Sequence, residues 1–194
     1  MRIVVTRDDL VERVEALGHT AVLCPLIRIE PLGDEPIDAS SYDWLIVTSA
    51  NGAHELGRRG VTAQRIAAIG PATAEALHEH GLHVDLVART HTQEGLRDET
   101  DGRLLLAAAE GARQDVLGAD FVPLYRTVEL PQEVDADIAL LMSGSAARAL
   151  RTPMKVVAIG PQTADEARAA GHDVVAEAAS HDVDGLLDAL ASLS

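Results

Sequence analysis

The pentapeptide Gly-Pro-x-Thr-Ala occurs twice in this chain, at residues 70–74 and 160–164. Each copy follows an apolar run that ends in Ala-Ile, and each begins a pattern typical of a helix. When residues 68–98 are aligned with residues 158–188 at a shift of 90 and without a gap, 13 of 31 positions are identical. About two or three identities are expected by chance. The chain is therefore a duplicated fold, and the paired strand-to-helix turns predict a cleft between two similar lobes.

The composition agrees with a duplicated α/β protein. The 194 residues, of which 47% are hydrophobic, suffice for one large domain or two small ones. Aromatic residues make up only 2%, so the predicted core is built from Val, Ile, Leu and Ala. Together with 24% charged residues and 15 glycines, this usage is typical of a soluble α/β protein rather than a disordered or fibrous one.

The charge of the chain excludes several classes of partner. The net charge is −15, and Lys155 is the only lysine beside 15 arginines, so we expect no nucleic-acid partner and no anionic membrane partner. Cys24 is the only cysteine, which excludes an internal disulfide and a thiolate metal cluster, and its apolar neighbours predict a buried strand residue. The chain shows no signal region and no apolar stretch near the ~20 residues that span a bilayer. We therefore expect a cytoplasmic protein.

Short β-rich runs alternate with helical patterns along the chain, which indicates parallel strands connected by helices. The predicted strands lie near residues 2–6, 20–24, 43–48, 65–69, 83–87, 103–107, 119–123, 137–142, 154–159 and 173–177. Predicted helices at residues 8–17, 72–80 and 162–170 end at Gly18, Gly81 and Gly171, because glycine readily takes the left-handed conformation that closes a helix.

Two proline-bounded segments, residues 25–31 and 123–131, interrupt this alternation and resemble each other. If the chain crosses from lobe to lobe twice, the two segments would run side by side as a two-stranded linker. The alternative is two sequential halves, residues 1–100 and 101–194. Periodicity alone leaves both arrangements open.

The candidate sites are the turns where strands end and helices begin. A second repeated element, at a shift of 94, places Ser49, Ala50 and Asn51 in one turn and Ser143, Gly144 and Ser145 in its counterpart. With the two Gly-Pro-x-Thr-Ala turns, four turns carry small or hydroxyl residues that leave helix-start N–H groups open to an anion. Each contact contributes about 0.3–1 kcal/mol when exposed, so the predicted ligand carries several negative groups. For any single turn, ordinary helix capping is the alternative.

Several sharper motifs are missing from the sequence. Neither the dinucleotide motif Gly-x-Gly-x-x-Gly nor the phosphate-binding loop Gly-x-x-x-x-Gly-Lys-[Ser/Thr] occurs. Ser143 lacks the preceding glycine of a nucleophile elbow. His78, His80 and His83 cross a predicted helix end at Gly81 and do not converge, so we interpret them as surface residues rather than metal ligands.

Six segments, in order, resemble the uroporphyrinogen-III synthase family. They are residues 4–7 (Val-Val-Thr-Arg), 25–31 (Pro-Leu-Ile-Arg-Ile-Glu-Pro), 43–52 (Asp-Trp-Leu-Ile-Val-Thr-Ser-Ala-Asn-Gly), 123–127 (Pro-Leu-Tyr-Arg-Thr), 158–164 (Ala-Ile-Gly-Pro-Gln-Thr-Ala) and 184–190 (Asp-Gly-Leu-Leu-Asp-Ala-Leu). The match covers nearly the whole chain. It implies two flavodoxin-like (Rossmann-like) α/β lobes with parallel sheets, joined by a two-stranded linker. Lobe 1 would comprise residues 1–25 plus 132–194, lobe 2 residues 35–122, and the linker strands residues 26–34 and 123–131.

The resemblance also implies an activity. The family closes hydroxymethylbilane, a linear tetrapyrrole with eight carboxylates, into uroporphyrinogen III, with inversion of the last ring and loss of water, in tetrapyrrole and haem biosynthesis. No metal and no organic cofactor is implied. We expect a monomer that binds this small molecule, with a transient contact to the enzyme that makes it. The rival hypothesis is a non-catalytic bilobal binding protein for an anionic small molecule; a tetrapyrrole methyltransferase would need a methyl-donor site that we do not find.

The resemblance assigns one catalytic residue, Tyr125, at the linker position where the family has its best candidate for helping the hydroxyl leave. A phenol is protonated at neutral pH and can donate to that oxygen. The alternative is that Tyr125 only packs the hinge. Thr163 matches a family position for substrate carboxylates. The predicted substrate-binding residues are Thr6, Arg7, Ser49, Ala50, Asn51, Gly70, Thr73, Ser143, Gly144, Ser145, Gly160 and Thr163.

One departure from the family pattern and the net charge of the chain bear on the substrate; a second departure is a trimmed stretch between Arg7 and Gly18. Family members often carry an arginine near position 108, where this chain has Ala108, so a cationic contact is either lost or supplied by Arg113. The charge of −15 repels a polyanion until salt screens it, over a Debye length of about 8 Å at physiological ionic strength. The sequence therefore predicts an activity that rises with added salt.

Overall fold

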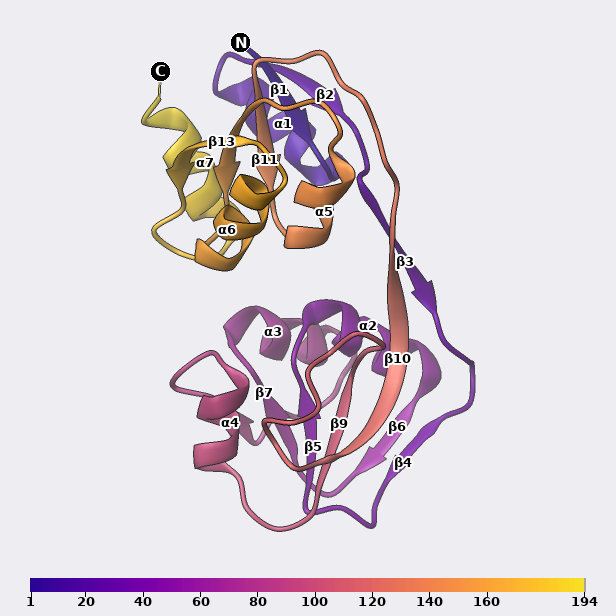
Figure 1. Ribbon diagram of the computed structural model, residues 1–194. Helices are drawn as coiled ribbons and strands as arrows, with labels where there is room; N and C mark the ends of the chain where they lie inside the picture. The colour runs from indigo at the N-terminus through magenta and orange to yellow at the C-terminus, as the bar shows by residue number, and fades with distance from the viewer. Residues whose placement is uncertain (194) are drawn as a thin grey trace. The chain divides into compact units, whose positions relative to one another are not determined.

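The structure, a computed structural model, describes residues 1–193 and divides into two units. Unit 1 comprises Met1–Arg28 and Val128–Ser194, and unit 2 comprises Ile29–Thr127. Each unit is an α/β fold built around a parallel sheet (Figure 1). The predicted α/β fold with parallel sheets is confirmed.

Unit 1 carries a five-stranded sheet in the order β13-β12-β11-β1-β2. Its elements are β1 (Arg2–Val5), a short 3-10 turn (Asp8–Leu10), α1 (Val11–Ala16), β2 (Thr20–Leu23), β11 (Ile138–Leu141), α5 (Gly144–Ala149), β12 (Lys155–Ala158), α6 (Pro161–Ala169), β13 (Asp173–Glu177) and α7 (Val183–Ala191). The predicted helix at residues 8–17 is thus a 3-10 turn followed by a short α-helix.

Unit 2 carries a sheet in the order β10-β9-β5-β7-β8, with β3 (Ile27–Pro31) next to β10 (Asp120–Glu129) at the edge. Its elements are β4 (Ile37–Ala39), β5 (Trp44–Val47), α2 (Ala50–Arg59), β6 (Val61–Ala63), β7 (Ile66–Ala68), α3 (Pro71–Glu79), β8 (Leu86–Val87), α4 (Gln93–Glu99) and β9 (Leu104–Ala109). The pair β4 and β6 forms a small separate parallel sheet, which the sequence did not predict.

The sheets of the two units have the same arrangement of strands, but the chain enters that arrangement at a different strand in each unit. When β8, β7, β5, β9 and β10 are matched with β13, β12, β11, β1 and β2, the strand order is identical. The helices α3 and α4 then correspond to α6 and α7, as the sequence repeat requires. Glycine ends the repeated helices as predicted, since Gly81 and Gly171 have φ values of 72° and 89°.

The strands β3 (Ile27–Pro31) and β10 (Asp120–Glu129) carry the chain across the boundary between the units. They are neighbours in the sheet, and Leu32 N donates to Leu124 O at 2.8 Å while Leu130 N donates to Leu26 O at 2.9 Å. The predicted two-stranded linker is therefore confirmed. The strand β10 is a single ten-residue strand that includes both the predicted strand at 119–123 and the linker that follows it.

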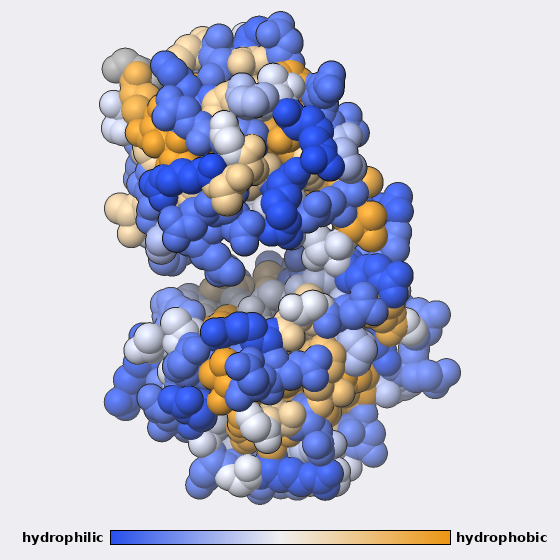
Figure 2. All heavy atoms as spheres, viewed as in Figure 1, coloured by the Kyte–Doolittle hydropathy of each residue, from blue (hydrophilic) through white to orange (hydrophobic). Residues whose placement is uncertain are grey.

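Both cores are aliphatic, as the composition predicts. In unit 1, Ile3, Val5 and Leu140 are fully buried beneath α7, and in unit 2, Leu45 and Val47 are fully buried with residues of α2 and α3. Hydrophilic residues cover much of the visible face of each unit (Figure 2). None of the helices in residues 1–193 is long and apolar enough to cross a membrane.

The prediction that Cys24 is a buried strand residue is wrong. Cys24 follows the end of β2, an edge strand of the unit 1 sheet, and its side chain is only partly buried. Edge strands are covered on fewer sides than central ones, so an apolar run such as residues 21–24 does not guarantee full burial there. Partial burial is enough to raise the pKa of the Cys24 thiol.

Candidate functional site

The candidate residues of unit 2 gather at the carboxyl edge of its sheet. Val47 at the end of β5 pairs with Ala68 at the end of β7 and with Ala107 of β9, which continues to Ala109. The turns that follow these strands carry Ser49 and Gly70 to this edge. In open parallel sheets this edge is where ligands bind.

Tyr125 reaches the same edge because β10 is irregular. Its pairing with β9 shifts register between Pro123 and Tyr125, and Tyr125 ends opposite Ala109. Proline has no N–H to give to the ladder, and such an irregularity redirects the side chain that follows it. The Tyr125 ring is 5% exposed and packs against the core of unit 2.

The phenol of Tyr125 has one specific partner. Its Oη lies 2.9 Å from the Oγ of Ser49, and either atom can be the donor. Ser49 is also the N-cap of α2, where its Oγ accepts from Gly52 N at 3.0 Å. Because that oxygen already accepts one hydrogen bond from the helix, the Ser49 hydroxyl proton is free to point at Tyr125.

Unit 1 repeats the capping serine of this arrangement but not the tyrosine. Ser143 caps α5, with its Oγ accepting from Ala146 N at 3.2 Å, as Ser49 caps α2. The segment Pro25-Leu26-Ile27-Arg28 corresponds to Pro123-Leu124-Tyr125-Arg126, so Ile27 occupies the place of the tyrosine. The phenol is therefore specific to unit 2.

The two Gly-Pro-x-Thr-Ala turns differ from the starts of α2, α4, α5 and α7. Serine, threonine or aspartate caps α2, α4, α5 and α7 by a side-chain hydrogen bond, whereas Gly70 and Gly160 at the starts of α3 and α6 make none. The N–H groups of the first turn therefore keep no partner within the helix.

The threonines of these turns are nearly buried. Thr73 is 4% and Thr163 6% exposed, yet neither hydroxyl has a hydrogen-bond partner within residues 1–193. The fully enclosed polar side-chain atoms that lack a partner belong to other residues, so both hydroxyls keep some contact with solvent. A nearly buried side chain whose unpartnered hydroxyl keeps some contact with solvent is suited to hydrogen-bond a ligand.

Some of the remaining predicted residues already make side-chain hydrogen bonds within the protein, and others lie at helix starts. Arg7, which follows Thr6 after β1, makes two hydrogen bonds to the Asp9 carboxylate, at 2.8 and 2.6 Å. Ser145 Oγ accepts from Arg148 at 3.1 Å. Ala50 and Asn51 form the first turn of α2, and Gly144 begins α5, where a β-carbon would come within 2.7 Å of Glu166.

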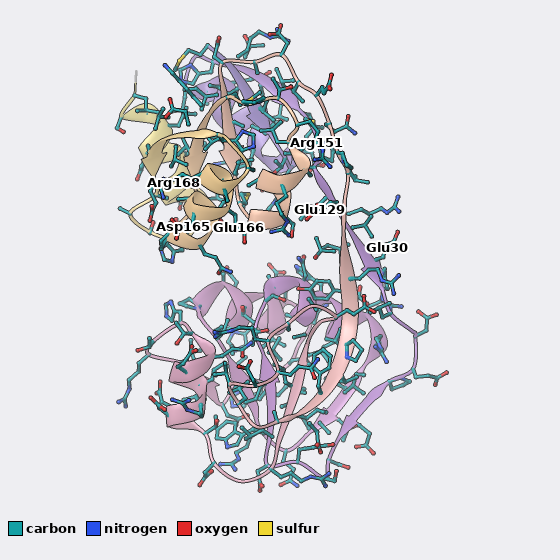
Figure 3. All side chains as sticks on the ribbon, in the orientation of Figure 1. Glu30, Glu129, Arg151, Asp165, Glu166 and Arg168 are labelled. Atoms are coloured by element: carbon teal, nitrogen blue, oxygen red, sulfur yellow. The ribbon has the colours of Figure 1, made fainter. Side chains whose placement is uncertain are left out.

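Arginines near the candidate residues are already paired with carboxylates. In unit 1, Arg148 binds Glu129 at 2.8 Å and Glu166 at 2.9 Å, and these hydrogen bonds raise the pKa of Arg148. Figure 3 shows Glu166 on α6 and Glu129 at the end of β10. In unit 2, Arg113 binds Glu94 at 2.9 Å. Backbone N–H groups and hydroxyls are therefore the uncommitted donors at these edges.

The sequence analysis missed two histidines. His91 lies against Gly70 and His181 against Gly160, at corresponding positions of the two units. The signal was present, because both are among the identities of the aligned repeat. Within residues 1–193, no group of three or more His, Cys, Asp or Glu side chains is arranged to hold a metal ion.

Comparison with known proteins identifies the family. The family model described as uroporphyrinogen-III synthase HemD matches residues 8–188, nearly the whole chain. The chain belongs to the uroporphyrinogen-III synthase family. The crystal structure of a mutant uroporphyrinogen-III synthase from the bacterium Thermus thermophilus has the same fold, with a TM-score of 0.64 and 18% identity over 98% of this chain and 97% of that one.

The relatives found by sequence match this chain over only part of its length. A protein of Methanocaldococcus jannaschii, provisionally named uroporphyrinogen-III synthase, is 26% identical over 163 residues, which is 73% of this chain and 68% of that protein. One of Methanothermobacter thermautotrophicus with the same provisional name is 32% identical over 106 residues, 48% of this chain. This second match spans only 42% of the relative's length.

Proposed function

We propose that this protein is a uroporphyrinogen-III synthase, a lyase that cyclises hydroxymethylbilane with inversion of the last pyrrole ring. Family membership and fold support the proposal, and the observation that carries it is the hydrogen bond between Ser49 and Tyr125. The chain has only two tyrosines, and the other, Tyr42, gives its hydroxyl to Asp120 at 2.9 Å. Of the two phenols, Tyr125 is thus the one that is not paired with a carboxylate within residues 1–193.

Substrate binding would rest largely on backbone and hydroxyl groups. The first turns of α3 and α6 offer free N–H groups, and Thr73 and Thr163 add hydroxyls beside them. The substrate carries eight carboxylates, so many contacts of about 0.3–1 kcal/mol each can add up without a paired arginine. Ser143, Ser145, Thr6 and Asn51 remain in the proposed binding set.

Tyr125 would act as the acid in the first step. The substrate hydroxyl leaves as water when its oxygen receives a proton, which Tyr125 Oη supplies, while the C–O bond breaks and the adjacent pyrrole nitrogen provides the electron pair. The Ser49 hydroxyl then donates a hydrogen bond to the phenolate oxygen and keeps its own proton. The hydrogen bond from Gly52 N to Ser49 Oγ holds Ser49 in place for this.

The later steps need positioning more than acid or base strength. The electrophilic methylene carbon is attacked by the substituted carbon of the last ring, which forms a spiro intermediate; that ring is then released and rejoined in the inverted sense. A proton leaves a ring carbon at the end and restores the one Tyr125 gave, so water is the only other product. Holding the carboxylates fixed selects this closure over the direct one.

The asymmetry between the units favours an enzyme over a binding protein. Both units keep the capping serine and the Gly-Pro-x-Thr-Ala turn, which suffice to bind anions, but only unit 2 has the phenol, where unit 1 has Ile27. A binder that used both units alike would have no use for this difference. Cofactor independence, the monomeric state, a cytoplasmic location and transient contact with the enzyme that makes the substrate remain predictions.

The proposal is tested by the rate at which hydroxymethylbilane disappears. The protein is mixed in excess over freshly prepared substrate, and the first-order decay is compared with the spontaneous closure in buffer. A synthase accelerates the decay, whereas a binding protein protects the bilane and slows it. Decay at or below the spontaneous rate, across the salt range used below, would eliminate the enzyme.

A further inference from the structure

Each unit holds a histidine ring directly against an uncapped helix start. A β-carbon built on Gly70 would lie 3.3 Å from His91 Cγ and 3.5 Å from Nδ1. One built on Gly160 would lie 2.9 Å from His181 Cδ2 and 3.0 Å from Nε2. Any side chain at either glycine would press on the imidazole.

The backbone does not explain these glycines. Gly70 has φ −170° and Gly160 has φ 176°, both extended values that any residue adopts. A serine at either position would also cap the helix, as Ser49 caps α2. The close contact at each glycine is instead with the histidine ring, which would have to shift to admit a side chain there.

The loops that carry the two histidines are held in the same way. Thr92 caps α4 through Gly95 N at 3.1 Å, and Asp182 caps α7 through Gly185 N at 2.8 Å. A β-carbon at Gly95 would lie 2.1 Å from Thr90 O, and one at Gly185 would lie 2.5 Å from Ser180 O. In both units the loop backbone beside the histidine therefore lies close against the first turn of the following helix.

Within residues 1–193, neither imidazole is held by a hydrogen bond, although the charge of His181 helps to lower the pKa of the neighbouring Asp182. Both histidines are exposed, and neither ring hydrogen-bonds to another residue in the described part of the chain. The nearby carboxylates are occupied: Glu94 binds Arg113, Glu99 accepts from Arg89 N, and Asp182 caps α7. An imidazole offers one N–H when neutral and two when protonated.

We infer that His91 and His181 each donate an imidazole N–H to a carboxylate held at the adjacent helix start. The second sign of a ligand is the threonine of the same turn, nine-tenths buried with an unpartnered hydroxyl, in both units. Ring N–H, helix-start N–H groups and threonine hydroxyl form one carboxylate site per unit. The inference rests on the proposed function, because a polycarboxylate is the ligand that needs two such sites.

The test uses uroporphyrin III, a stable octacarboxylate, as the probe. The imidazole proton signals of the protein are recorded by NMR during a titration and are assigned with single histidine variants. The signals of His91 and His181 are expected to move with bound probe, while that of His78, which is exposed on α3 away from Gly70, stays in place. Binding that leaves both signals unmoved would overturn the inference.

Kinetics provide a second measurement. His91→Ala and His181→Ala are each expected to raise KM about two- to tenfold with little change in kcat, as for loss of one hydrogen bond. His91→Gln and His181→Gln, which keep an N–H donor, should recover part of that loss, and His78→Ala serves as the control. An unchanged KM in the double alanine variant would also overturn the inference.

The proposed synthase activity and the inferred carboxylate sites can be refuted independently of each other. A protein that forms no isomer III but whose two histidine signals respond to uroporphyrin III keeps its carboxylate sites and loses its proposed activity. A protein that forms isomer III with an unchanged KM in the double variant keeps its activity and loses these sites. Gly160→Ala gives a further check, because it displaces His181 while the extended backbone tolerates it, and the same rise in KM is expected.

Discussion

Replacing Tyr125 by phenylalanine removes one oxygen atom from the proposed acid. The ring remains in the core of unit 2, and Ser49 keeps its cap on α2 through Gly52 N at 3.0 Å. The net loss for folding is therefore one hydrogen bond, of 2.9 Å in the native protein, and contributes about 0.5–1.5 kcal/mol. The variant is expected to fold.

The kinetic loss should be larger than the loss in stability. General acid catalysis contributes about 10²- to 10⁴-fold, which is about 2.7–5.4 kcal/mol in the activation barrier. We expect kcat of Tyr125→Phe to fall by that factor while KM stays within about threefold, since the phenol is not part of the carboxylate sites. If Tyr125 only packed the hinge, kcat would follow the small change in stability.

The assay measures isomer III formed from hydroxymethylbilane, with the spontaneous isomer I as internal reference. Tyr42→Phe is the matched control, because its hydroxyl binds Asp120, the first residue of β10, whereas Tyr125 lies in the middle of that strand. The control should keep kcat within about twofold, because the hydroxyl that it removes bonds to Asp120 and lies outside the proposed site. A Tyr125→Phe protein that folds and keeps its kcat would refute the acid role.

Three other predictions follow from the structure. Ser49→Ala removes both the donor to Tyr125 and the cap of α2, so kcat and the melting temperature should fall together, the latter by the equivalent of about 1 kcal/mol. Ser49→Thr keeps a hydroxyl and should retain most of kcat. Equal losses of kcat in the two variants would contradict the donor role. Synthase activity should rise from low to molar salt, because the Debye length shrinks to about 3 Å at 1 M and screens the charge of −15 from a polyanionic substrate; a flat or falling response would contradict this. The hydrogen bonds from Gly185 N and Ser180 lower the pKa of Asp182 in the folded protein. The Asp182 carboxylate therefore stabilises the fold at pH values above its pKa in the unfolded chain, near ~3.9, and this stabilisation is lost as the pH falls through its lower pKa in the folded protein. Asp182→Asn keeps the cap without the titration, and thermal melts between pH 7 and 3 should be less steep in pH for the variant than for the natural protein; equal slopes would show that Asp182 is not responsible.

The features that the sequence predicted are those carried by local chemistry. The repeat, the aliphatic strands and the glycines that end helices follow from spacing and backbone preference, so two parallel-sheet lobes and a paired linker could be expected. The missed sheet of β4 and β6 consists of two three-residue strands, which leave no periodic signal. The partial burial of Cys24 depends on β2 being an edge strand, which only the assembled sheet shows.

The site was predictable by residue type but not by contact. Tyr125 meets Ser49 because β10 shifts register after Pro123, and no spacing of residues 49 and 125 in the sequence contains that shift. For the histidines the sequence signal was present, but the contact that gives it meaning was not visible. His91 and His181 are identical in the repeat, but their meaning appears only when each ring is found against the glycine of a helix start.

The most direct test of the account is the isomer that this protein makes. Hydroxymethylbilane is generated enzymatically, incubated with the protein from low to molar salt, and oxidised, and the uroporphyrins are separated by chromatography. The account predicts uroporphyrin III in excess over isomer I, with the excess lost in Tyr125→Phe. Isomer I alone at every salt concentration would mean that the chain keeps the fold of the family without its reaction.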